Sequence, residues 1–233
     1  MIEAEWWDYE TPDEMAEAVA GDVGFIIESA LDARNECLLA LPGGKSPIPI
    51  FERLKKQKFP WKRVTIIPGD DRLVPVDNAL SNARLLATHF MPLGARVVPI
   101  ASAELGVRQA GEAANARLSD LKWPPDLIWL GMGTNGHTAS IFHGEQYDEA
   151  LSSPKRAIGL VPDPLPPEAP VARVTLTRSA ILSARAIMLT IAGAEKKRVL
   201  EEALEQGTKS DWPIGRVLAD AEQPIDIHWS EMP

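Results

Sequence analysis

A glycine-rich turn after an apolar run is the part of this sequence best suited to chemistry. Residues 127–130 have the length of a buried strand, and residues 131–140 then supply His137 followed by two hydroxyl side chains. Glycines let backbone N–H groups approach a ligand closely, and a histidine can transfer a proton near neutral pH. Because open α/β sheets bind ligands at the carboxyl ends of their strands, the pattern predicts a catalytic loop. A glycine turn with a hydrogen-bonded, purely structural histidine is the alternative.

The same turn also fits the dinucleotide-binding pattern, with Gly131, Gly133 and Gly136 as its glycines. That pattern needs the third glycine inside a helix and an acidic residue about 20 positions further on. Here His137 follows the third glycine at once, the next acidic residues come too early, and Asp163 lies in a proline-rich segment. We therefore expect no dinucleotide cofactor.

A second glycine turn, formed by Gly43, Gly44, Lys45 and Ser46, ends like a phosphate-binding P-loop. The first glycine of a P-loop is missing, because Leu39 holds its position, and this excludes an NTPase. Ser46 is expected to cap a helix whose free N–H groups suit a phosphate, and Lys45 adds a positive charge. An ordinary tight turn with a good cap is the alternative.

Charged residues follow other apolar runs. Asp70 and Arg72 come after residues 64–67 and could bind sugar hydroxyls or orient a base. A solvated charged loop without a function is the alternative, because it has the same residue types. Arg173 precedes another apolar stretch, and Lys196 lies at the start of a predicted helix. A lysine is unfavourable against the dipole at a helix N-terminus unless an anion lies there. Lys196 therefore indicates an anion site, with a plain surface charge as the alternative.

Composition narrows the class of protein. The chain has 233 residues, 45% of them hydrophobic, and its net charge of −9 argues against a nucleic-acid partner. Its single cysteine, Cys37, cannot form an internal disulfide, which fits a cytoplasmic protein. Residues 1–10 lack a signal-peptide core, and no run approaches the ~20 apolar residues of a membrane span. We expect no membrane partner and a monomer or small homo-oligomer.

Strand-like apolar runs alternate with segments of helical periodicity along the whole chain. This alternation predicts an α/β fold in which a mostly parallel sheet carries helices on both faces, as a single domain over residues 1–233. We expect strands at 38–41, 64–67, 97–100, 127–130, 158–161, 187–191 and 225–229, helices at 11–35, around 50–54, 85–90, 104–121 and 194–206, and a surface loop at 163–170.

Taken together, the motifs resemble the 6-phosphogluconolactonase family. The sequence GGKSP from residue 43 resembles the family's GGSTP, and DDRLVP from residue 70 with SN at 81–82 resembles DERxVP…SN. The sequence GMGTNGHTAS from residue 131 resembles GxGxDGHTAS, and RVTLT from residue 173 with GAEK from residue 193 resembles RxTLT…GxxK. These motifs keep the family's order over nearly the whole chain.

The resemblance implies a fold, an activity and a set of roles. The fold would be NagB/RpiA-like, related to glucosamine-6-phosphate deaminases. The activity would be hydrolysis of 6-phospho-D-glucono-1,5-lactone to 6-phosphogluconate in the pentose phosphate pathway, without a metal or organic cofactor. His137 would be the general base that activates water, and Arg72 would bind or polarise the lactone. Arg173 and Lys196, with the loop at residues 43–46, would hold the phosphate. A lactone is an activated ester, so water and one base suffice.

Three residues depart from the family pattern. Asn135 stands where the family usually has Asp, Asp71 where it has Glu, and His143 where it has Pro. An amide at position 135 can orient His137 but gives no charge to stabilise the protonated ring. Either activity is reduced, or Asp70 supplies the carboxylate, and both possibilities stay open.

Two other functions remain as alternatives. An amino-sugar-phosphate isomerase or deaminase of the same superfamily needs a carboxylate base, where this chain has Asn135. A catalytically weakened sugar-phosphate-binding protein is the other, and the missing aspartate is its only support.

Overall fold

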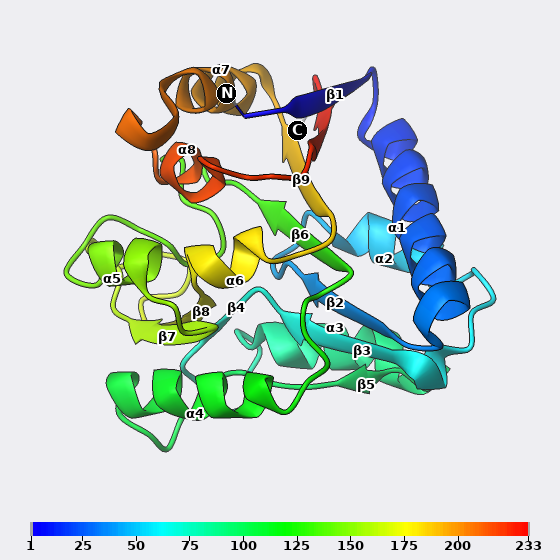
Figure 1. Ribbon diagram of the computed structural model, residues 1–233, viewed down its shortest axis with the longest axis horizontal. Coiled ribbons are helices and arrows are strands. Elements are labelled where there is room, and N and C mark those ends of the chain that lie inside the picture. Colours follow the sequence, from blue (N-terminus) through cyan, green and yellow to red (C-terminus); the bar gives the residue numbers. More distant parts are fainter. Residues whose placement is uncertain (1, 233) are drawn as a thin grey trace.

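The apolar runs form a central parallel sheet in the computed structural model, which describes residues 2–232 (Figure 1). Within these residues seven strands pair, and every pair of neighbours is parallel. Both faces of the sheet are covered, which explains why its central strands are mostly apolar runs. The strands in sheet order are β1 (Ala4–Tyr9), β10 (Ile225–Ser230), β9 (Ile187–Ala192), β6 (Leu127–Gly131), β2 (Cys37–Leu41), β3 (Val64–Pro68) and β5 (Arg96–Val97).

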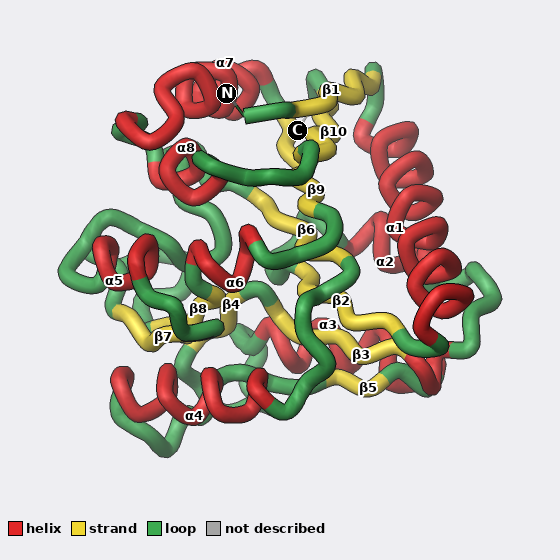
Figure 2. Tube along the Cα trace, in the orientation of Figure 1, coloured by secondary structure: helices red, strands yellow, loops and turns green. Residues whose placement is uncertain are grey.

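Two hydrophobic cores lie on the two faces of this sheet. Successive strand side chains point to opposite faces, so Leu39 and Trp129 pack with α1, α2 and α3, whereas Ala40 and Ile128 pack with α4 to α8. Figure 2 shows the helices on either side of the strands. The helices are α1 (Pro12–Arg34), α2 (Ile48–Leu54), α3 (Asn82–Phe90), α4 (Val107–Ser119), α5 (Tyr147–Ser152), α6 (Arg178–Leu182), α7 (Ala194–Gln206) and α8 (Pro213–Leu218), with 3-10 turns η1 (Trp61–Arg63), η2 (Met91–Leu93) and η3 (Gly207–Lys209).

A smaller antiparallel sheet, which the sequence does not predict, packs against the second face. It consists of β4 (Asp70–Arg72), β8 (Arg173–Leu176) and β7 (Ala157–Leu160). Val174 and Leu176 join the same core as Ile128, so the small sheet is not a separate unit. Its register places Asp70 opposite Thr175 and Arg72 opposite Arg173.

The predicted α/β fold class is confirmed, and several boundaries hold closely. Helix α1 begins after Thr11, whose Oγ1 accepts the N–H of Glu14 at 3.2 Å, and it ends at Asn35 in a left-handed conformation. Cys37, the single cysteine, is buried. Across residues 2–232, no helix is long and apolar enough to span a membrane.

Some elements differ from the sequence-based expectations. Strand β1 lies within residues 1–10, for which the sequence predicts no helix or strand. Its alternating exposure is typical of an edge strand. Strand β5 ends at Val97 rather than continuing to Ile100, because Pro99 has no N–H to donate to a ladder. The N–H of Val98 still reaches the carbonyl of Ile66 at 2.9 Å.

The sheet order creates a crevice at the carboxyl ends of the strands. The chain runs outward from β2 to β3 and β5, and then returns to β6 on the other side of β2. The loops after β2 and β6 therefore leave the sheet in opposite directions. Such a topological switch point is where open α/β sheets bind their ligands.

Candidate active site

A cleft of about 220 Å³ opens at this switch point. It is lined by loops that follow β2, β3, β6 and β9, and these loops contribute Gly43, Asp70, Arg72, His137 and Lys196. Gly44 and Ser46 also line the cleft, whereas the remaining predicted site residues, Lys45, Asn135 and Arg173, do not. The fold therefore brings most of the predicted residues to one place.

The loop after β6 holds His137 in a tight turn. The N–H of Gly133 donates to the carbonyl of His137 at 3.0 Å, and the N–H of Gly136 donates to the carbonyl of Gly133 at 3.0 Å. Gly136 has a φ of +74°, and a Cβ there would lie 2.9 Å from Cβ of Trp212. Only glycine fits this turn. Because the N–H groups of Gly133 and Gly136 are already bonded, they are not free to bind an oxyanion.

The tautomer of His137 follows from its contacts with Asn135. Oδ1 of Asn135 lies 2.5 Å from Nδ1 of His137 and 3.3 Å from its backbone N. A backbone N–H can only donate, so the amide atom facing it is the oxygen. Nδ1 therefore carries the hydrogen, and Nε2 keeps a free lone pair. Phe142 stacks on the ring with 4.2 Å between centroids and fixes its plane.

Burial lowers the pKa of His137, and the negative charges of Asp70 and Glu168 oppose that shift. The imidazole is therefore neutral near pH 7 and able to accept a proton. Asp70 accepts a hydrogen bond from the hydroxyl of Ser140, whose N–H donates to Oγ1 of Thr175 at 3.2 Å. Among the bonds that residues 2–232 form, none joins Asp70 to His137 directly, so the carboxylate acts on the ring through space.

Asn82, the second residue of the SN pair at 81–82, links three loops of the site. Its Oδ1 accepts Nη1 of Arg72 at 2.7 Å, and its Nδ2 donates to the carbonyl of Asp70 at 2.7 Å. It also touches Gly43 closely, since a Cβ on that glycine would lie 1.9 Å from Oδ1 of Asn82. Arg72 donates a second bond to the carbonyl of Leu80 at 2.9 Å. Asn82 thus fixes the guanidinium at the cleft wall.

Asp71 is a buried carboxylate beneath this network. It accepts backbone N–H groups from Arg72 at 2.8 Å, Asn82 at 2.6 Å and Ala83 at 3.0 Å. Burial raises its pKa to about 6, although these three donors favour the charged form. Ser81 is the N-cap of α3, and its hydroxyl also donates to the carboxylate of Asp71. In the sequence, the only indication that Asp71 contacts the start of α3 is a carboxylate ten residues before a Ser-Asn pair.

The loop after β2 presents unused hydrogen-bond donors. Within residues 2–232, the N–H groups of Gly43, Gly44, Lys45 and Ser46 make no hydrogen bond. The prediction that Ser46 caps the next helix is wrong, because α2 begins at Ile48 after a turn and has no side-chain cap. The uncapped loop leaves a row of N–H groups at the cleft, which suits an anion.

Lys196 lies across the cleft from this loop, in the first turn of α7. Burial lowers its pKa from the ordinary value, and nearby Glu195 opposes the shift. Lys45 is exposed. Among the residues that line the cleft, the cationic side chains are those of Lys196 and Arg72.

Arg173 lies behind the cleft and is only 2% exposed. Its guanidinium donates to the carbonyl of Ala169 at 2.7 Å and to that of Val171 at 2.9 Å. Burial and neighbouring Arg72 lower its pKa. Arg173 thereby anchors the proline-rich loop, which with His137 and Asn135 lines a second hollow of about 510 Å³.

Comparisons with known proteins agree on one family. The family described as glucosamine-6-phosphate isomerases/6-phosphogluconolactonase matches residues 10–229. A 6-phosphogluconolactonase of Rhizobium meliloti is 36% identical over 95% of this chain and 97% of its own length. One from Pseudomonas putida is 36% identical over 92% of this chain and 88% of its own length. The crystal structure of a 6-phosphogluconolactonase from Shewanella baltica superposes with a TM-score of 0.90 at 30% identity, covering 98% of both chains.

Proposed function

Because this chain belongs to the glucosamine-6-phosphate isomerase/6-phosphogluconolactonase family, we propose that its cleft hydrolyses 6-phospho-D-glucono-1,5-lactone with His137 as the general base. The resemblance seen in the motifs is confirmed by these comparisons. The activity is that of a 6-phosphogluconolactonase, a carboxylic ester hydrolase of the pentose phosphate pathway. One observation carries the mechanism: Asn135 holds Nδ1 of His137, which leaves Nε2 free beside a cleft with anion-binding groups.

In the proposed reaction, Nε2 of His137 removes a proton from water as its oxygen attacks the lactone carbonyl carbon. The carbonyl oxygen becomes an oxyanion, and Arg72, whose guanidinium Asn82 holds at the cleft wall, would stabilise it. The bond from that carbon to the ring oxygen then breaks, and the imidazolium returns the proton to the leaving ring oxygen. The products are the open-chain carboxylic acid and a neutral histidine.

The phosphate would bind at the other end of the cleft. The free N–H groups of residues 43–46 and the ammonium of Lys196 suit a phosphate dianion. Binding there supplies energy remote from the reacting carbon, and this energy positions the lactone against His137. Arg173, which the family resemblance assigns to the phosphate, would act from behind the cleft by ordering the loop it anchors.

We also propose that the enzyme works in the cytoplasm as a monomer or small homo-oligomer, without a nucleic-acid partner. Its net charge of −9 and its single cysteine support this proposal.

The test compares three substrates with the same protein. Fresh 6-phosphogluconolactone is assayed by coupling its product to 6-phosphogluconate dehydrogenase, against an enzyme-free blank because the lactone also hydrolyses spontaneously. Unphosphorylated gluconolactone and glucosamine 6-phosphate serve as comparisons. We expect efficient turnover of the phosphorylated lactone alone. Turnover of glucosamine 6-phosphate would favour a deaminase, and binding without turnover would favour a sugar-phosphate-binding protein.

A further inference from the structure

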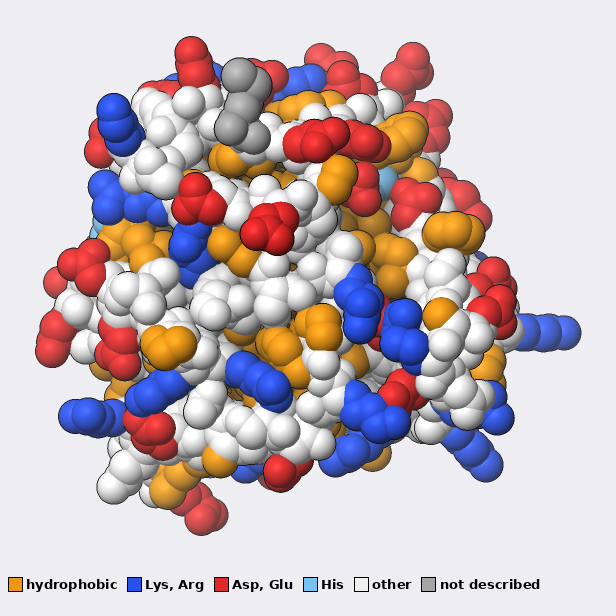
Figure 3. Space-filling view, viewed as in Figure 1, with side chains coloured by type: hydrophobic (Ala, Val, Ile, Leu, Met, Phe, Trp, Pro, Cys, Tyr) orange, Lys and Arg blue, Asp and Glu red, His pale blue; other side chains and the backbone are white. Residues whose placement is uncertain are grey.

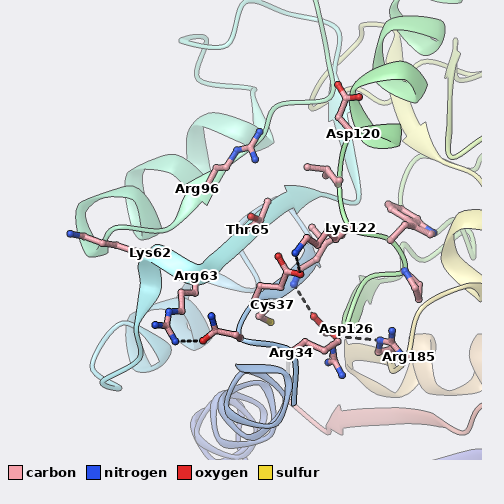
Figure 4. Close-up of a pocket in the computed structure, with 16 residues that line it drawn as sticks. Arg34, Cys37, Lys62, Arg63, Thr65, Arg96, Asp120, Lys122, Asp126 and Arg185 are labelled. Atoms are coloured by element: carbon pink, nitrogen blue, oxygen red, sulfur yellow. Dashed lines mark hydrogen bonds and ion pairs between the residues drawn. The ribbon is translucent and has the colours of Figure 1, made fainter. Parts of the chain in front are cut away.

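A larger hollow, of about 600 Å³, lies at the opposite edge of the sheet, where β2, β3, β6 and β9 begin (Figure 4). Six basic and three acidic side chains line it, an excess of three positive charges in a chain whose net charge is −9. Figure 3 shows Lys and Arg side chains gathered on this part of the surface, near the C-terminal end of α1. The basic residues are Arg34, Lys62, Arg63, Arg96, Lys122 and Arg185.

Asp126 orders two of these arginines at the rim. Its carboxylate is buried and accepts the N–H of Leu38 at 2.9 Å. Its other oxygen pairs with Arg34 and lies 3.5 Å from Nε of Arg185. The two arginine side chains remain 37% and 49% exposed. A guanidinium has five N–H donors, so most donors of this pair are fixed in direction but unused.

The other basic residues differ in how far their charge is compensated. Lys122 pairs with Glu36 at 2.6 Å, and Arg63 donates a hydrogen bond to the neutral amide of Asn35. Arg96, at the start of β5, forms no ion pair with any residue from 2 to 232, and the same holds for Lys62. The uncompensated charge therefore lies on the arginine pair, whose two guanidiniums share the single carboxylate of Asp126, and on the opposite wall at Lys62, Arg63 and Arg96.

We propose that this hollow binds a small molecule that carries two or more phosphate groups. Guanidinium groups match phosphate oxygens in geometry and charge, and the arginine pair is ordered before any ligand arrives. A hollow of this volume suits a small ligand, and cations on two walls favour an elongated, multiply charged one. Trp123 on the wall adds an aromatic surface that a nucleotide base could contact.

The experiment is calorimetric titration of the intact protein at low salt with sodium tripolyphosphate and, separately, with ATP. The variant that tests the site carries Arg96→Ala and Arg185→Ala together, which leaves Asp126 paired with Arg34. The control is Arg198→Ala, an exposed arginine on α7 that pairs with Glu202. Lys196→Ala is titrated in parallel to identify binding in the catalytic cleft.

We expect the double variant to bind tripolyphosphate at least about tenfold more weakly, as loss of charge-assisted contacts predicts. Arg198→Ala should bind tripolyphosphate as tightly as the wild type does, and Lys196→Ala should still bind it in this hollow. The double variant should keep the wild-type kcat/KM for the lactone. Tighter binding of ATP than of tripolyphosphate would support a nucleotide, and equal binding would support recognition of the phosphate chain alone. If neither probe binds, or if Lys196→Ala alone abolishes binding, the proposal is wrong.

Discussion

Oδ1 of Asn135 lies 2.5 Å from Nδ1 of His137, so one amide oxygen selects the tautomer of the proposed catalytic base. An aspartate at this position would select the same tautomer and would also add a negative charge. Asn135 therefore still orients the ring of His137, as the aspartate usual in the family would, but it does not supply that residue's negative charge. That separation makes the contribution of the charge measurable.

Asn135→Asp should raise the pKa of His137, because an adjacent carboxylate favours the imidazolium. Burial pushes this pKa in the opposite direction in the wild-type protein. The acidic limb of the kcat/KM profile should therefore move to higher pH, and the rate on the high-pH plateau should hold or rise. The measurement is a pH–rate profile of both proteins.

Asp70→Asn is the matched control for the carboxylate already present. Because the charge of Asp70 raises the pKa of His137, its removal should move the acidic limb to lower pH. If Asp70 already stabilises the protonated ring, this variant should also lose activity and Asn135→Asp should change little. Superimposed profiles of all three proteins would show that no carboxylate is coupled to His137.

Lys196→Ala should weaken binding of the phosphorylated lactone. A charge-assisted contact contributes about 1.5–3 kcal/mol, so KM should rise roughly ten- to a hundredfold. Its neighbour Lys197 is the control, since that ammonium pairs with Asp8 at 3.2 Å and lies over the ring of Trp229. Lys197→Ala should leave KM near normal. Equal losses on phosphorylated and unphosphorylated lactone would show that Lys196 does not contact the phosphate.

Asp71 should make stability depend on pH in an unusual direction. Its pKa is about 6 in the folded protein and 3.8 in the reference state, so the folded protein binds the proton more tightly. This favours folding below the reference pKa, and the benefit is lost as pH rises through 6. Between pH 7 and pH 4, the wild type should therefore gain about 2–3 kcal/mol of unfolding free energy relative to Asp71→Asn.

Urea unfolding of both proteins across this pH range provides the measurement. At neutral pH, Asp71→Asn also costs about 1–3 kcal/mol, because the amide oxygen can keep the N–H groups of Arg72 and Asn82 but the amide NH₂ then faces the N–H of Ala83. Parallel pH dependences for the two proteins would contradict the raised pKa of Asp71.

The sequence predicts the position of most of the site because parallel strands end at the same edge of a sheet. The runs that became β2, β3, β6 and β9 are buried on both faces and easy to recognise. The residues that follow these four strands therefore lie close together. This explains why Gly43, Arg72, His137 and Lys196 line one cleft.

Other features depend on contacts between distant segments. The pairing of β4 with β8 buries Arg173 and turns it toward backbone carbonyls, which its local sequence does not indicate. The local sequence indicates only that Asn82 starts a helix. The structure adds its bonds to Arg72 and to the Asp70 carbonyl, which the sequence does not predict. Strand β1 was not predicted because its side chains are only half-buried or exposed at the edge of the sheet, so it is not an apolar run.

Removal of metal ions should leave activity unchanged. Hydrolysis of an activated ester by one base requires no Lewis acid, and residues 2–232 contain no group of three or more His, Cys, Asp or Glu side chains placed to hold a metal. The check is the lactone assay after dialysis against EDTA. Strong inhibition would instead point to a metal bound by His137, Asp70 and His143.

The rate of 6-phosphogluconolactone hydrolysis by His137→Ala, measured against wild type and an enzyme-free blank, tests the central claim most directly. His143→Ala is the control, because that ring hydrogen-bonds to the carbonyl of Asp211 at 2.9 Å and is not among the residues that line the cleft. Loss of a positioned base should lower kcat of His137→Ala by ~10²–10⁴-fold, while a phosphorylated product analogue still binds. Turnover near the wild-type rate would show that His137 is not the base.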